Sequence, residues 1–351
     1  MRNVAVIAEG NPFDPCNFVY PIRLGDPLKL LEQQDILRLQ VCSSDMDWDW
    51  SEFDTIVVQR APFTSLDALQ HGLEELHKAI RAGCRLIYEL DDHIFCPGLP
   101  GIIGQSRIDE LDPEAYQRTQ AHRRLLDLAH LVTCSTLPLA NALKGLGTCC
   151  PVRVLRTGLD FSAPRWSLEQ QTQLPAHRPF TIGWSGGSRV GRDLELLLPV
   201  LPRLFERFPG ARFAIGGSTK YAELFEDFPE ERLLVWDWVS YEEYPKWLRQ
   251  VDVALIPMQD HSYNRCKSSL KPIDYGAMGI PAVCSPVAPF TDMKPAGPGL
   301  YLAESVQDWV AAVEAASSEF SAPASRADLS ARTRATHDLS NLLADYAKIY
   351  G

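Results

Sequence analysis

The sequence lacks any long apolar run, and this absence limits where the chain can reside. Its longest apolar stretches, such as residues 4–8 and 253–257, fall far short of the ~20 residues that a helix needs to cross a bilayer. The apolar residues after Met1 and before Glu9 are also too few for the core of a secretory signal. We therefore expect no transmembrane segment and a cytoplasmic location.

Positive charge is scarce as well. The chain has 34 Lys and Arg against 45 Asp and Glu, which gives a net charge of −11. Such a chain repels polyphosphates and anionic membranes at long range, which argues against a general nucleic-acid binder. The nine cysteines are odd in number, and no pair has the two-residue spacing of a zinc or redox site. We expect reduced and mostly buried thiols.

Short runs rich in Val and Ile alternate with longer segments of helical period, which is the pattern of βαβ units around a parallel sheet. The predicted fold class is therefore α/β. Strands are expected at residues 4–8, 36–42, 55–59, 85–89, 131–134 and 152–155, and again at 180–184, 212–216, 233–236, 253–257, 282–284 and 299–302. Helices are expected at 65–82, 113–129 and 339–350.

A stretch rich in Gln, Pro and Ser precedes residue 180 and has the composition of a linker. Because 351 residues can bury two cores of ordinary size, we expect two Rossmann-like domains. The first domain is expected to cover residues 1–160 and the second residues 180–338. A linker at 161–179 joins them, and a closing helix is expected at 339–351.

A glycine-rich turn opens the second domain at residues 185–193, between an expected strand and an expected helix. Glycines such as Gly186 and Gly187 let the backbone approach a ligand closely, and the following helix offers unpaired N–H groups to an anion. The spacing is neither that of the dinucleotide fingerprint nor that of the P-loop, so a plain strand-to-helix turn stays open. Arg189 and Arg192 add bidentate phosphate ligands and favour the functional interpretation.

Residues 263–281 contain a second candidate site. Ser268 or Ser269 can cap a helix that begins there, and Lys267 would then stand just outside its N-terminus. A phosphate bound at this point would meet the helix N–H groups and the lysine together. Asp274, about one turn inside, can accept hydrogen bonds from two vicinal hydroxyls of a ribose. Spacing alone does not exclude an exposed lysine and a helix-stabilising aspartate.

Several segments resemble those of glycosyltransferases with the GT-B fold, especially the retaining family four. Residues 267–281 look like the lysine, acidic residue and Gly-x-Pro segment of that family, and 183–193 like its phosphate-contacting glycine loop. Further likenesses follow in the family's order at 20–27, 88–95, 133–136 and 156–160. The resemblance implies a nucleotide-sugar donor in the cleft between two domains, transfer to an acceptor hydroxyl with retention, and no cofactor.

The resemblance also assigns roles to residues. The donor-binding set is Gly186, Gly187, Arg189, Arg192, Trp238, Val239, Lys267, Ser268, Ser269, Leu270 and Asp274. The acceptor-binding set is Arg23, Asp91, Asp92 and His93, and the catalytic candidates are Lys267, Arg192, Asp92 and His93.

Asp91, Asp92 and His93 follow an expected strand, at the edge where open α/β sheets bind ligands. A capping aspartate pair with a satisfied histidine is the alternative, and the residues leave both open. The two aspartates are adjacent, whereas the metal-binding aspartates of GT-A enzymes have one residue between them. We therefore expect no metal.

The sequence departs from the family where two glutamates seven residues apart are common. Asp274 replaces the second and Cys266 occupies the position of the first, so the usual contact to the donor sugar is in question. An epimerase or phosphorylase on the same fold, or an inactive nucleotide-binding scaffold, remain alternatives. The acceptor is expected to be a saccharide, a lipid-linked molecule or a small molecule, and the acidic charge disfavours a modified DNA base.

Overall fold

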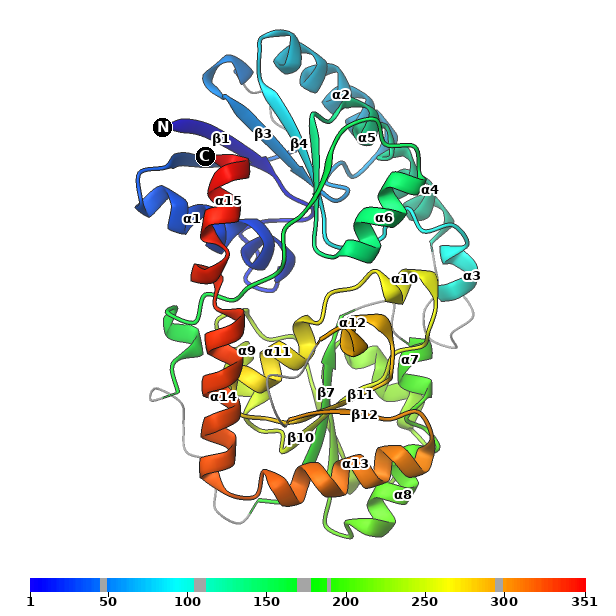
Figure 1. The fold of residues 1–351 in the computed structure, drawn as a ribbon. Coiled ribbons are helices and arrows are strands. Elements are labelled where there is room, and N and C mark those ends of the chain that lie inside the picture. The colour runs from blue at the N-terminus through cyan, green and yellow to red at the C-terminus, as the bar shows by residue number, and fades with distance from the viewer. Residues whose placement is uncertain (45–48, 104–111, 169–177, 188–190, 294–298) are drawn as a thin grey trace.

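A computed structural model describes residues 1–44, 49–103, 112–168, 178–187, 191–293 and 299–351. In it the chain forms two α/β domains, one above the other, each built on a six-stranded sheet (Figure 1). The strand order is β2-β1-β3-β4-β5-β6 in the first sheet and β12-β11-β10-β7-β8-β9 in the second, and the paired strands are parallel. The predicted fold class, α/β with two Rossmann-like domains, is confirmed.

The twelve expected strands are all present, with ends that differ from the predicted ones by at most two residues. The first sheet contains β1 (Arg2–Ile7), β2 (Leu37–Cys42), β3 (Thr55–Gln59), β4 (Arg85–Leu90), β5 (Leu131–Cys134) and β6 (Val152–Val154). The second contains β7 (Thr181–Gly186), β8 (Arg212–Gly217), β9 (Leu233–Trp236), β10 (Val253–Ile256), β11 (Ala282–Cys284) and β12 (Leu300–Leu302). Central strands such as β3 and β10 are buried throughout, because helices cover both faces of a parallel sheet.

The helices of the first domain are α1 (Asp26–Gln33), α2 (Leu66–Arg81), α3 (Leu99–Ile103), α4 (Pro113–Ala121), α5 (Arg124–Leu128) and α6 (Leu137–Gly145). A π-helical turn, Pro21–Gly25, leads into α1. The single helix expected at 113–129 is wrong, since it breaks into α4 and α5 at His122. The ring of that residue is buried and bonds to the Arg118 carbonyl (2.8 Å) and the Phe63 N–H (3.2 Å).

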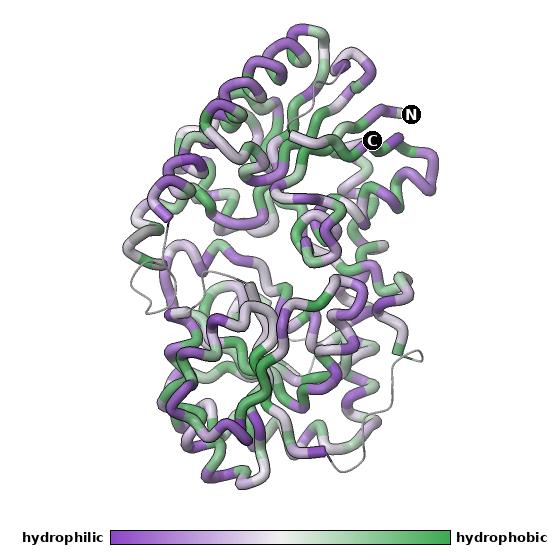
Figure 2. The backbone as a smooth tube through the Cα atoms, turned by 180° about the vertical axis from the view of Figure 1, so that it is seen from behind, coloured by the Kyte–Doolittle hydropathy of each residue, from purple (hydrophilic) through white to green (hydrophobic). Residues whose placement is uncertain are grey.

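The helices of the second domain are α7 (Gly191–Glu195), α8 (Val200–Arg207), α9 (Tyr244–Leu248), α10 (Ser262–Arg265), α11 (Leu270–Ala277), α12 (Ala288–Thr291), α13 (Val306–Glu319) and α14 (Pro323–His337). Short 3₁₀ turns lie at Trp50–Glu52, Pro164–Trp166, Thr219–Phe225, Glu230–Arg232 and Leu339–Asn341. Apolar residues gather along the strands at the centre of each domain, while hydrophilic ones dominate the outer helices (Figure 2). Within the described ranges, no helix has both the length and the apolar character that a membrane span requires.

The chain crosses between the domains twice, and the two crossings lie together. Leu159 exchanges backbone hydrogen bonds with the segment after α14, accepting from Leu339 at 2.9 Å and donating to His337 at 3.1 Å. After this crossing, α15 (Leu343–Tyr350) packs beside α1 on the first domain, where both termini lie (Figure 1). The hydroxyl of Tyr350 is 3.3 Å from that of Thr133 on β5. The last helix therefore completes the core of the first domain.

Candidate active site between the two domains

A cavity of about 260 Å³ lies between the domains, where strands of both sheets end. Ligands bind at this edge of open α/β sheets. The first domain and the crossing contribute Phe18, Val19, Ile22, Arg23, Asp91 and Thr157. The second domain contributes Ser185, Gly186, Gly187, Gly216, Gly217, Asp237, Trp238, Val239, Tyr244, Trp247, Ser268, Leu270, Lys271 and Asp274.

Glycines at the ends of β7 and β8 form one wall, and side chains are excluded there. A Cβ on Gly216 would come within 1.9 Å of the Trp247 ring. Gly217 has φ +102°, which few other residues adopt, and its Cβ would meet the Gly186 carbonyl at 2.3 Å. Gly186 and Gly187, at the end of β7, also line the cavity. The backbone there is bare, as a phosphate-binding loop requires.

The two arginines predicted to bind phosphate from this loop, Arg189 and Arg192, are not seen in the described part of the cavity wall. Arg189 lies outside the described residues. Arg192 is not among the residues that line the cavity, and its carbonyl accepts a hydrogen bond from the Gln259 side chain at 2.9 Å. The buried carboxylate of Asp193 accepts from the Gln259 N–H (2.7 Å) and the Asn264 amide (3.0 Å), and burial raises its pKa to about 6. Asp193 therefore ties α7 to the segment before α11.

Aromatic side chains also line the cavity, next to the glycine wall. Trp238 is 43% exposed and meets Phe18 edge to face, with ring centroids 5.8 Å apart. Phe18 also contacts Tyr244, at 5.1 Å, and Tyr244 stacks on Trp247 at 6.4 Å. Both domains thus contribute aromatic rings to a part of the cavity that suits the ring of a ligand. Sequence reasoning found Trp238 and Val239 but missed the other three aromatic residues, which carried no motif.

Asp274 projects from the middle of α11 and is 4% exposed. Its Oδ2 accepts a long hydrogen bond from the Tyr244 hydroxyl at 3.4 Å. Its Oδ1 is buried and has no hydrogen-bond partner among the described residues. Burial raises the pKa of this carboxyl well above its usual range. A buried acceptor without a donor is costly, so this wall of the cavity is suited to a ligand that brings hydroxyl donors.

Two lysines flank the start of α11 and face different ways. Lys271 lines the cavity, with Nζ 4.6 Å from the centroid of the Trp184 ring. Lys267 does not line it, and its Nζ is 3.5 Å from Asp92 Oδ1 and 4.5 Å from the Tyr263 ring. Burial alone would lower the pKa of Lys267, but Asp92 holds it above its ordinary value. Lys267 is therefore a charged link between the domains.

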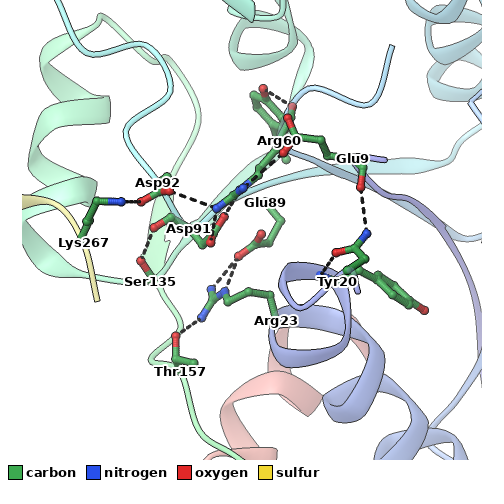
Figure 3. Close-up of polar contacts among 12 residues, drawn as sticks. Glu9, Tyr20, Arg23, Arg60, Glu89, Asp91, Asp92, Ser135, Thr157 and Lys267 are labelled. Atoms are coloured by element: carbon green, nitrogen blue, oxygen red, sulfur yellow. Dashed lines mark hydrogen bonds and ion pairs between the residues drawn. The ribbon is translucent and has the colours of Figure 1, made fainter. Parts of the chain in front are cut away.

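An ion network joins the strand ends of the first domain to this lysine (Figure 3). The Arg60 guanidinium binds both oxygens of Asp91 and lies 3.2 Å from Asp92 and 3.3 Å from Glu9. Arg60 has φ +52°, an unfavourable conformation that persists where the surroundings demand it. Sequence reasoning missed Arg60, although its place directly after β3, at the ligand-binding edge, could have indicated it.

Arg23 and His93, two of the expected acceptor residues, are both almost completely buried. Arg23 is 3% exposed and donates to Glu89 (2.8 Å), the Leu155 carbonyl (2.8 Å) and Thr157 (3.0 Å). Arg23 thus forms part of the cavity wall while it holds β4 and the crossing segment together. His93 is 4% exposed and does not line the cavity, and burial lowers its pKa. Of the expected acceptor residues, Asp91 lines the cavity together with Arg23, and Asp92 lies at the link to Lys267.

The N-terminus of α11 separates this cavity from a second one of about 440 Å³. Ser268 and Leu270 line both cavities, whereas Lys267 and Ser269 line only the second. Ser269 occupies the N-cap position but makes no capping hydrogen bond through its side chain. The N–H groups of the first helical turn therefore begin at a point that both cavities share.

Cys266, at the position of the family's first glutamate, does not face the cavity. Its side chain is buried and packs with the apolar core of the first domain, although the residue belongs to the second. Its carbonyl accepts a hydrogen bond from Thr136 at 2.8 Å, and Ser262 lies 3.2 Å from Cys96. These contacts form a seam between the domains, so the cysteine has a packing role there.

Residues 179–319 match the family model described as Glycosyl transferases group 1. The fold is similar to sucrose-phosphate synthase from Thermosynechococcus elongatus, with a TM-score of 0.66 and 12% identity, over 100% of this chain and 98% of that one. A sequence search of curated proteins gives no match.

Two further solved structures have a similar fold. HepE from Anabaena, in complex with UDP and glucose, has a TM-score of 0.64 and 14% identity, over 99% of both chains. The catalytic domain of starch synthase IV from Arabidopsis thaliana, bound to ADP and acarbose, has a TM-score of 0.61 and 10% identity, over 100% of this chain and 98% of that one. At such identities the likeness establishes the two-domain fold.

Proposed function

We propose that this chain, which has the GT-B fold, is a glycosyltransferase that transfers a sugar from a nucleotide sugar to an acceptor hydroxyl; the match of residues 179–319 to the glycosyl transferases group 1 model and the likeness of its fold support this. The observation that carries the proposal is that three kinds of group line one cavity. They are the aromatic side chains around Trp238, the carboxylate oxygen of Asp274 that has no partner among the described residues, and the bare glycine wall. These groups suit the base, the ribose and the diphosphate of a nucleotide sugar.

We assign the base to the surface formed by Trp238 and Val239, and the ribose hydroxyls to Asp274. The diphosphate lies against Gly186 and Gly187 and the N-terminus of α11 at Ser268 and Leu270, where N–H groups and the helix dipole favour an anion. These groups can stabilise the charge on the leaving diphosphate without a metal. Initial rates measured in the presence of a chelator test that part.

We place the transferring sugar and the acceptor near Asp91, Asp92 and Lys267, where the domains meet beside the N-terminus of α11. During transfer the bond from the anomeric carbon to the diphosphate breaks, and a bond to the acceptor oxygen forms. Asp91 is bound by Arg60, and Asp92 by Arg60 and Lys267, so these carboxylates are poorly placed to act as nucleophiles. We propose that transfer proceeds with retention, without a carboxylate nucleophile, and that the leaving phosphate takes the acceptor proton.

The reaction fits the cytoplasm, because all nine cysteines are free thiols, as in a reducing compartment. The acceptor class stays as predicted, a saccharide, a lipid-linked molecule or a small molecule. Its identity is the part that a screen must supply.

The first experiment is a thermal-shift screen of UDP-, ADP- and GDP-sugars, since UDP and ADP are bound in the similar structures. A ligand at 100 times its dissociation constant adds about 2.7 kcal/mol to the free energy of unfolding. Transfer from the donor that binds is then assayed over a panel of acceptors, and NMR of the product determines the anomer. Donor turnover without any acceptor would indicate an epimerase, and tight binding without turnover an inactive scaffold. No stabilisation by any nucleotide sugar would refute the proposal.

A further inference from the structure

We propose that Lys271 provides the cation that binds the diphosphate of the donor in the interdomain cavity. The inference rests on the proposed function, because it presumes a diphosphate there. Sequence reasoning placed a cation at this point but chose Lys267, which pairs with Asp92 outside the cavity. Lys271 lines the cavity itself.

The position of Lys271 on α11 matches the covalent structure of a nucleotide. Lys271 and Asp274 are three residues apart, so they share one face of the helix, and both line the cavity. One helical turn rises ~5.4 Å. The first phosphate of a nucleotide is joined to its ribose through a single methylene group. A cation one turn before the ribose-binding carboxylate is therefore within reach of the phosphates.

The ammonium also lies against the glycine loop. A Cβ placed on Gly186 would be 2.4 Å from the Trp184 ring and 2.8 Å from Lys271 Nζ, so the glycine backbone, the ring and the ammonium lie together. The ring of Trp184 lies 4.6 Å from Nζ and holds it there by a cation–π contact. Lys271 and the bare backbone of the loop thus meet at one point, as a pair of ligands for one anion would.

Lys271 makes no ion pair or hydrogen bond with the described part of the chain. The charged or titratable groups that act on it are Asp193 on α7, Lys267 before α11, Asp274 on α11 and Cys284 on β11. Neither aspartate comes within ion-pair distance, and Asp193 already has three hydrogen bonds, to the Gln259 N–H and the Asn264 amide. A partly buried cation without a carboxylate partner is unfavourable, and an anionic ligand removes part of that cost.

The same surroundings give donor binding a pH dependence. Burial, together with the charge of Lys267, lowers the pKa of Lys271 to about 8. A bound diphosphate favours the charged form and raises this pKa, so affinity is fully present below pH 8 and falls as the pH rises above it. Above that pH, donor binding takes up a proton. The charge on the leaving diphosphate grows as the bond to the sugar breaks, so the same ammonium stabilises the transition state.

The test uses UDP, ADP and GDP as probes, with uridine, adenosine and guanosine as versions that lack the diphosphate. Binding to the full-length protein is measured by titration calorimetry at pH 7 and pH 9, in two buffers of different ionisation enthalpy. For the wild type we expect weaker diphosphate binding and proton uptake at pH 9. Lys271→Met should weaken diphosphate binding at pH 7 at least about tenfold, abolish the proton uptake and leave nucleoside binding unchanged.

Two further variants complete the design. Lys271→Arg keeps the charge and should retain diphosphate binding at pH 9, because arginine does not lose its proton. Lys246→Met removes an exposed lysine of α9 and should bind as the wild type does. Wild-type binding and an unchanged pH profile in folded Lys271→Met would overturn the role of Lys271 while leaving the proposed function intact. Failure of the wild type to bind UDP, ADP and GDP would overturn both.

Discussion

Replacing Asp274 by Asn should weaken nucleotide binding and at the same time stabilise the empty protein. The carboxyl is 4% exposed, its Oδ1 has no partner among the described residues, and the Tyr244 hydroxyl reaches Oδ2 only at 3.4 Å. A ribose would donate to this carboxylate, and a hydrogen bond to a charged group contributes about 1.5 to 3 kcal/mol. The dissociation constant for UDP or ADP should therefore rise about 10- to 150-fold in Asp274→Asn.

The effect on stability has the opposite sign. The pKa of Asp274 is raised in the folded protein, so above the pKa of the unfolded chain the folded state resists ionisation and loses stability as the pH rises. Asn removes this cost and keeps the shape. The unliganded variant should therefore be at least as stable as the wild type at pH 7, and its stability should depend less on pH.

Calorimetry with UDP and ADP measures the affinity, and thermal unfolding between pH 5 and pH 8 measures the stability. Asp193→Asn is the matched control, since Asp193 is also buried but accepts from Gln259 and Asn264. An amide there would oppose the Asn264 amide, so this control should lose about 1 to 3 kcal/mol of stability. If Asp274→Asn binds the nucleotide as tightly as the wild type, Asp274 is not in the donor site.

Three further predictions follow from the seam and from the glycine wall. Lys267→Ala should lower the turnover number about 10²-fold with a smaller change in donor affinity, because it removes a cation at the sugar end; wild-type turnover in the folded variant would contradict this. Small-angle scattering should show compaction on binding of the nucleotide sugar, since the two halves of the site lie on separate domains, and a profile insensitive to saturating ligand would count against closure. Gly216→Ala should cost about 1 to 3 kcal/mol of stability and weaken nucleotide binding, because its Cβ would lie 1.9 Å from the Trp247 ring. An unchanged melting temperature would show that the ring can move.

The sequence predicted the framework well, because parallel strands covered on both faces are continuous apolar runs. The segment at β3, Thr55–Gln59, is the simplest case, since all five residues are buried and its predicted ends match the observed ones. Helix ends depend more on distant contacts. The break between α4 and α5 occurs because the ring of His122 bonds to Phe63, which lies 59 residues away along the chain. No local pattern carries that information.

The sequence also located much of the cavity, because glycine turns and helix starts leave local signals. Gly186, Gly187, Trp238 and Asp274 all line it. The sequence did not predict which of two nearby lysine side chains faces the cavity. Lys267 and Lys271 are four residues apart and both suit a phosphate, but α11 begins between them, at Leu270. Lys271 is therefore on the helix face of Asp274, while Lys267 reaches across the seam to Asp92.

The sequence by itself determined the α/β class, the two sheets and the segments at their ligand-binding edges, because hydrophobic period, glycine and helix-capping residues act over a few neighbouring positions. Only the tertiary structure decided which side chains meet. Phe18 reaches Trp238 from the other domain, Arg60 gathers Asp91 and Asp92, and Cys266 of the second domain fills the core of the first. Such contacts join residues far apart along the chain, and they depend on how two separately folded sheets face each other.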